Sequence, residues 1–155
     1  MKKSYFISIL IALSVGGLSA LITRDGMSIY EDIVSPPLSP PSILFPIVWT
    51  ILFVLMGISS SIVFNSKGAP ASSRFQGLFT YGISLAVNFF WSIIFFNMRM
   101  YFLAFVWLVL LWVLILKTII EYWEINKIAA YLQIPYLIWV TFAGYLNFAI
   151  FLLNR

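Results

Sequence analysis

The chain has 155 residues, of which 63% are apolar, 19% aromatic and only 9% charged, and its formal net charge is +4. Soluble domains carry roughly a quarter charged residues, so this composition excludes a soluble domain and indicates an integral membrane protein. The absence of cysteine and histidine excludes disulfides, thiolate chemistry and histidine-ligated haem or metal sites.

The first expected span is Tyr5–Thr23. Two lysines precede this run, as in a cleaved signal peptide, but the run is long for such a peptide and the rest of the chain is equally apolar. We therefore expect it to remain as a span. Ala12, Gly16 and Ala20 form a stripe of small residues on one helix face. We expect this stripe to serve packing inside the monomer, ahead of dimerisation.

The longest connection, residues 24–42, follows this span and contains the run Ser35–Pro41, called here the proline segment. Four of the seven prolines of the chain fall in these seven residues, so a helix is excluded there. In a membrane protein such backbone must lie at the surface or be buried against other protein. We expect the segment to cap a cavity.

Four further apolar stretches are long enough to cross a bilayer, which takes about 20 residues. They are Ile43–Asn65, Gly77–Phe96, Tyr101–Tyr122 and Ala129–Leu153. The predicted fold is therefore all-α: one transmembrane domain, residues 1–155, with five spans and a long proline-rich loop between the first two. Gly82 and Ala86 form a second pair of small residues, equally consistent with internal packing and with a homodimer.

The distribution of lysine and arginine predicts the orientation. One side of the membrane carries six such residues, and the other carries Arg24, Arg99 and Arg155. Because basic residues favour the cytoplasmic side, we expect a cytoplasmic N-terminus and an external C-terminus, in a multi-pass protein of the bacterial cell membrane. This bias accounts for the net charge, so no nucleic-acid partner is expected.

The spans lack the usual groups of catalysis and driven transport. None carries a central aspartate, glutamate or lysine, and no serine has an activating base. Proton relays of coupled transporters, Schiff bases and conventional acid–base catalysis are therefore not expected. No metal site and no covalent cofactor are predicted.

Aromatic rings and amides recur at helical spacing on three spans. The stripes are Trp49, Phe53 and Gly57; Asn88, Trp91, Ser92 and Phe95; and Pro135, Trp139, Ala143 and Asn147. Small-ligand sites are mostly apolar with a few placed polar groups, and these faces predict such a site for a hydrophobic small molecule. Structural roles remain open: tryptophans also form interfacial belts, and buried amides also join helices.

Three segments resemble signatures of the TspO/translocator protein family. They are the first-loop run Ile29–Pro41 followed by Val48-Trp49-Thr50; Val87–Phe96, with its Asn-x-x-Trp-Ser-x-x-Phe-Phe; and Pro135–Asn147, with its Pro-Tyr-x-x-Trp-x-x-Phe-Ala-x-x-Leu-Asn. The matches occur in family order on the second, third and fifth spans, so the resemblance covers essentially the whole chain.

This resemblance implies a five-helix bundle, often dimeric, with a pocket beneath the first loop that binds porphyrins, sterols and aromatic ligands. Carried over by position, the pocket residues are Tyr30, Trp49, Phe53, Asn88, Trp91, Trp139, Ala143 and Leu146. The resemblance also implies light- and oxygen-dependent breakdown of protoporphyrin, in which Trp49 and Trp139 would donate electrons or intercept the reactive species.

Two departures from the family pattern concern the loop and the sterol motif. Ile29 and Leu38 replace the tryptophans of the family's first loop, so part of its aromatic surface is missing. The usual sterol pattern near the fifth span is absent; a formal match at Leu116, Tyr122 and Lys127 is of a weak kind.

Three functional hypotheses follow. The first is a membrane receptor or sensor that binds a protoporphyrin-like tetrapyrrole and acts on it photochemically. The second is a passive carrier of porphyrins or other lipophiles that opens between the first two spans. The third is a packing or assembly subunit whose aromatic residues are only structural.

Overall fold

The computed structural model describes residues 2–28 and 33–155, and within them it contains helices and no strand. Five helices are long and apolar enough to cross a membrane. They are α1 (Lys2–Thr23), α3 (Leu44–Phe64), α4 (Ala71–Ser92), α5 (Tyr101–Trp123) and α6 (Lys127–Leu153). The five expected spans are thus confirmed, and the protein is a multi-pass, all-helical membrane protein.

Three helices begin earlier than their expected spans, α1 at Lys2, α4 at Ala71 and α6 at Lys127, and for α4 and α6 a local signal explains the start. α4 begins directly after Pro70, whose extended backbone (ψ 140°) ends the preceding turn. α6 begins after Asn126, whose side-chain oxygen accepts hydrogen bonds from the backbone N–H groups of Ile128 and Ala129, at 2.9 and 3.2 Å. This is an asparagine N-cap, which satisfies donors that have no partner inside the helix.

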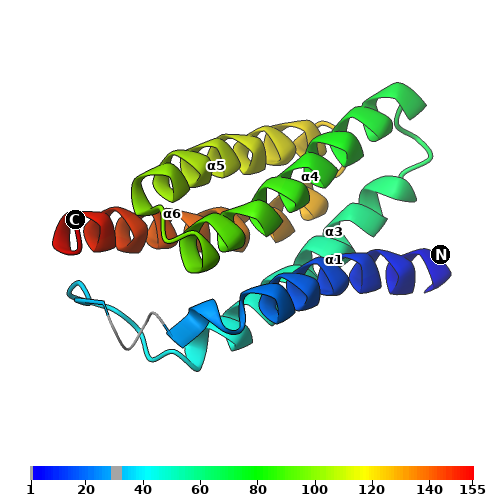
Figure 1. Ribbon diagram of the computed structural model, residues 1–155. Coiled ribbons are helices and arrows are strands. Elements are labelled where there is room, and N and C mark those ends of the chain that lie inside the picture. The colour runs from blue at the N-terminus through cyan, green and yellow to red at the C-terminus, as the bar shows by residue number, and fades with distance from the viewer. Residues whose placement is uncertain (1, 29–32) are drawn as a thin grey trace.

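α1 and α3 form a closely packed pair, and Figure 1 shows them beside the group of α4, α5 and α6. Ala12 is fully buried. A Cβ atom on Gly57 would lie 2.5 Å from the Cα atom of Ile9, so the two backbones nearly touch. The Ser8 hydroxyl donates a 2.7 Å hydrogen bond to the Gly57 carbonyl at the same crossing. The stripe of small residues on α1 therefore does serve packing within the monomer.

Polar groups join the remaining helices, because inside a membrane bundle they must find partners in the protein. The Ser60 and Tyr122 hydroxyls, 2.8 Å apart, join α3 to α5. Gln133 of α6 donates to the Ser59 hydroxyl of α3. The Trp107 indole donates to the Val87 carbonyl and joins α5 to α4. This tryptophan therefore fastens two helices and is not merely a lipid-facing ring.

α4 does not end as an α-helix. Its last turn continues as a five-residue π-helix, η2 (Ile93–Asn97), in which the Met98 N–H donates to the Ile93 carbonyl. A short 3-10 turn, η1 (Gly26–Ser28), lies close to it. A Cβ atom on Gly26 would come within 2.6 Å of the Phe96 carbonyl oxygen. The end of α1 and the end of α4 are therefore in tight contact.

Residues 33–43, which include the proline segment, contain turns and no helix. Asn154, just beyond α6, exchanges two hydrogen bonds with the backbone of Val34, at 2.8 and 3.0 Å. The Tyr145 hydroxyl donates to the Pro37 carbonyl at 2.6 Å. Leu38 has a positive φ of 68° and is 82% exposed. The segment is thus fastened to α6, at the end of the bundle where the C-terminus lies (Figure 1).

Gly57→Ala should lower the free energy of unfolding by about 1–3 kcal/mol, because the added methyl group overlaps the backbone of Ile9. Gly82→Ala is the matched control, since a Cβ atom there meets nothing within 4 Å. The control should be neutral or stabilising by up to about 1 kcal/mol. Denaturant unfolding of both variants in detergent measures the difference. Equal effects would contradict the close α1–α3 crossing.

Candidate functional site

A cavity of about 390 Å³ lies between α1 and α3 on one side and α4, η2 and α6 on the other. Its volume is within the range of small-molecule sites. It brings together seven of the eight predicted pocket residues: Trp49, Phe53, Asn88, Trp91, Trp139, Ala143 and Leu146. The eighth, Tyr30, lies outside the described residues.

The tryptophans of α3 and α6 meet inside this cavity. The ring centroids of Trp49 and Trp139 are 6.5 Å apart, and the rings are almost perpendicular, at 88°. Phe53 stacks on Trp49 at 5.7 Å, and Phe45 contacts Trp139 edge-on at 5.8 Å. Edge-to-face and offset contacts of this kind are favourable for aromatic rings. Together the four rings form an aromatic wall.

A second aromatic cluster forms at the junction of α4 and η2. Trp91 stacks on Phe95 at 5.3 Å and contacts Phe96 edge-on at 6.1 Å. Two consecutive residues of an α-helix point about 100° apart. Here both phenylalanines line the cavity, where the helix has changed to its π form. π-Helical turns occur frequently at functional sites.

The two candidate amides have different roles. The Asn147 oxygen accepts a hydrogen bond from the Trp91 indole at 3.0 Å, and its NH₂ group donates to the Tyr101 carbonyl at 2.8 Å. Asn147 therefore joins α6 to α4 and to the start of α5. Asn88 donates to the Tyr136 hydroxyl at 2.9 Å. Its carbonyl oxygen accepts nothing from the described residues, so it can serve a ligand.

The indole N–H of Trp139 is buried and has no hydrogen-bond partner among the described residues. A buried donor without a partner costs about 1–3 kcal/mol. Trp139 lines the cavity, but its N–H has almost no accessible surface, so a turn of the ring would be needed to offer this donor to a bound acceptor. A donor at Trp139 and an acceptor at Asn88 would then bind complementary groups of one ligand.

Sequence reasoning missed the wall that α1 contributes. Leu13, Gly16, Gly17 and Ala20 line the cavity. A Cβ atom on Gly16 would come within 2.5 Å of the Phe53 ring, so the ring can lie there only because this residue has no side chain. The stripe of small residues was the available signal, and it indicated packing alone.

Gly57, Pro135 and the proline segment were expected at the cavity, and none of them lines it. Gly57 faces α1, where a side chain would strike Ile9, and not the cavity. Pro135 is exposed on α6 and does not line the cavity. The proline segment itself contributes no residue to the lining; the neighbouring Ser42 does.

The lining offers no evident metal ligands, and within residues 2–28 and 33–155 no three acidic, histidine or cysteine side chains gather closely enough to hold an ion. What the cavity does provide is rings, small residues, one unpaired donor and one available acceptor. Such a site suits a flat, largely apolar ligand with a few polar atoms.

Fold and site together define a multi-pass membrane protein with a five-helix bundle around an aromatic cavity. The sequence profile of the TspO/MBR family matches residues 7–153. The tryptophan-rich protein TspO of Chlorobaculum tepidum is 39% identical over 145 residues, covering 93% of this chain and 91% of that protein. The chain belongs to the TspO/MBR family.

Other relatives extend the comparison. The protein CrtK of Rhodobacter capsulatus is 32% identical over 154 residues, covering 99% of this chain and 95% of that protein. The translocator protein of Bos taurus is 33% identical over 137 residues, covering 87% of this chain and 81% of that protein. The family resemblance expected from the sequence is thus confirmed.

Asn147→Leu should lower the free energy of unfolding by about 1–3 kcal/mol, because it leaves the buried Trp91 indole without a partner and also removes the bond to the Tyr101 carbonyl. Thr50→Val is the control: Thr50 also lines the cavity, but its hydroxyl bonds only within its own helix, to Pro46. Unfolding curves of both variants give the comparison. A loss for Thr50→Val as large as for Asn147→Leu would contradict the joining role of Asn147.

Proposed function

We propose that the protein is a membrane receptor or sensor that binds a hydrophobic, protoporphyrin-like tetrapyrrole in this cavity. The supporting observation is the convergence of Trp49, Trp139 and Trp91, from three helices, on one space that also holds an unpaired indole donor. A macrocycle would stack on these rings. Pyrrole N–H groups would face the Asn88 oxygen, and a carboxylate or carbonyl would face the Trp139 N–H.

We propose further that the tryptophans act when the bound porphyrin is excited by light in the presence of oxygen. The porphyrin would be the photosensitiser, and Trp49 and Trp139 would donate electrons or intercept the reactive oxygen species. Their rings lie edge to face at 6.5 Å, so both would contact the same ligand. Trp49 stacks in turn on Phe53, which also lines the cavity and extends the aromatic wall beside the ligand.

The passive carrier and the assembly subunit are the competing functions. A carrier that opens between α1 and α3 would have to separate backbones that nearly touch at Gly57 and Ile9. A purely structural subunit would have no use for a buried indole N–H without a partner. Both observations favour a receptor.

Titration of the purified protein with protoporphyrin in the dark, followed by tryptophan fluorescence, tests the site. Saturable quenching is expected. Trp49→Phe and Trp139→Phe should each weaken binding by about 2–10-fold, which corresponds to about 0.5–1.5 kcal/mol for one aromatic contact. Trp123→Phe is the control, because this ring lies outside the cavity with Lys127 above it at 5.1 Å. The absence of saturable quenching would overturn the tetrapyrrole site.

Illumination of the same samples tests the photochemistry through the porphyrin absorbance. Light- and oxygen-dependent bleaching is expected for the wild type and for Trp123→Phe, with slower bleaching for the two cavity variants at equal occupancy. Binding without bleaching would leave a receptor or carrier. Equal bleaching in all variants would remove Trp49 and Trp139 from the chemistry.

We infer that a homodimer, if formed, packs through the face of α4 that carries Gly82 and Ala86. Both residues are exposed, and a side chain on Gly82 would meet open space. Two copies of this face can approach closely, as small residues allow in membranes.

Gly82→Trp should therefore abolish cross-linking between two copies in detergent or liposomes. Val113→Trp, on the exposed face of α5, should leave it unchanged. Equal cross-linking of both variants would place the interface elsewhere.

The orientation, with the N-terminus in the cytoplasm, remains a prediction from the lysine and arginine bias, and reporter fusions at each terminus test it.

A further inference from the structure

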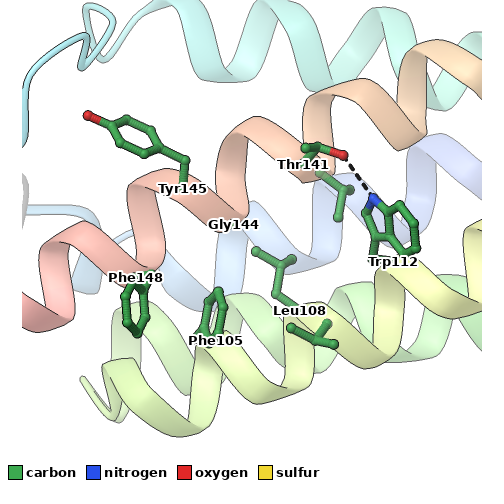
Figure 2. Close-up of a pocket in the computed structure, with 9 residues that line it drawn as sticks. Phe105, Leu108, Trp112, Thr141, Gly144, Tyr145 and Phe148 are labelled. Carbon is green, nitrogen blue, oxygen red and sulfur yellow. Dashed lines mark hydrogen bonds between the residues drawn. The ribbon is translucent and has the colours of Figure 1, made fainter.

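A second hollow lies on the opposite side of α6 from the cavity. It is a groove of about 360 Å³ between α5 and α6, called here the outer groove. Phe105, Leu108 and Trp112 of α5 and Gly144, Tyr145 and Phe148 of α6 form its floor and walls. Figure 2 shows Phe105 and Phe148 at one end and Trp112 at the other. A Cβ atom on Gly144 would meet only Leu108, at 3.9 Å, so the glycine leaves the floor open.

The polar groups of the outer groove already have partners. The Trp112 indole donates to the Thr141 hydroxyl at 2.8 Å, and that hydroxyl donates to the Leu137 carbonyl. The Tyr145 hydroxyl donates to Pro37. This differs from the cavity, where the Trp139 donor is unpaired. A ligand of the groove therefore gains nothing from polar atoms, and its bound part must be hydrocarbon.

The position of the groove along the helices indicates which hydrocarbon. Trp112 and Thr141 lie near the middles of the spans α5 and α6, and Phe105 and Phe148 lie seven residues nearer the end that carries the proline segment. Seven helical residues extend roughly 10 Å, and half of the hydrocarbon core is roughly 15 Å thick. The groove thus lies within one leaflet, along the direction in which a lipid tail extends from its headgroup.

The formal sterol pattern does not mark this groove. Its tyrosine, Tyr122, has no exposed surface and pairs with Ser60 inside the bundle. It cannot present its ring to a membrane lipid. The groove is instead flanked by Val109 and Phe148, which are exposed and within the spans.

We propose that the outer groove is a binding site for one acyl chain of a phospholipid from the leaflet on the side of the proline segment. The chain passes over the Phe105 and Phe148 rings, which contact each other at 4.9 Å, lies over Gly144 and ends near Trp112. This site is separate from the tetrapyrrole cavity, so the proposal does not depend on that function.

Native mass spectrometry of the protein, purified from defined phosphatidylcholine nanodiscs into mild detergent, tests the site. The wild type should retain one phosphatidylcholine per chain. Gly144→Leu should lose it by filling the floor, and Phe148→Ala should lose it by removing a wall. Val106→Phe is the control, since Val106 is exposed on α5 outside the groove and should retain the lipid as the wild type does.

Phosphatidylcholine with brominated chains gives a second readout in the nanodiscs. The difference in quenching between the wild type and Trp112→Phe isolates Trp112, and Gly144→Leu should reduce it several-fold. The site would be overturned if Gly144→Leu and Phe148→Ala retained the lipid and were quenched as strongly as Val106→Phe. A retained sterol in place of phospholipid would overturn the acyl-chain assignment. Dimers that separate on filling the groove would show that a second copy occupies it.

Discussion

The hydrogen bonds of Asn147 are the interaction on which the cavity depends. This one amide accepts from Trp91 of α4 and donates to the backbone at the start of α5, although it belongs to α6. Lipid offers no alternative partner for such groups, so the three helices are held at one mutual position. Trp91, once fixed, sets the place of Phe95 and Phe96. The aromatic end of the cavity follows from a single side chain.

Helix α6 separates two spaces of different chemistry. On one face, Ala143 and Leu146 border a cavity with an unpaired donor and an available acceptor. On the other face, Gly144 and Phe148 border a groove whose polar groups are all engaged. Recognition inside the bundle is therefore open to polar atoms, whereas recognition on its outside is limited to shape and hydrocarbon. A tyrosine on the outer face, Tyr145, also holds the proline segment.

The spans and much of the candidate site could be predicted from the sequence. Charge-free windows give the spans, because a bilayer excludes charge over a fixed length. A helical period of 3.6 residues gives the faces on which Trp49, Asn88 and Trp139 lie. The partner of each face could not be predicted. Gly57 shares a face with Trp49, but it meets α1, and only the packing of two backbones shows this.

Two further features also lay beyond the sequence pattern. The place of α1 in the cavity wall depends on Gly16 and Gly17 being small. Because glycine has no side chain, its position in the sequence does not indicate a ligand-binding face. The division of labour between the two amides depends on which partners each one meets. Asn147 engages both its oxygen and its NH₂ group within the protein, whereas Asn88 engages only its NH₂ group, with Tyr136. The part of the expected site that includes Tyr30 lies outside the described residues.

The π-helical turn Ile93–Asn97 accommodates one residue more than an α-helical turn with the same ends. Deleting one residue there would restore a regular helix, and the segments on both sides would keep their orientation because the ends of the turn stay the same. Deleting Phe95 or Phe96 would remove one ring from the cavity wall, while the length and direction of the span would hardly change. Insertions and deletions at this turn are thus a route by which related chains could alter ligand preference in a single genetic step, without disturbing how the bundle crosses the membrane.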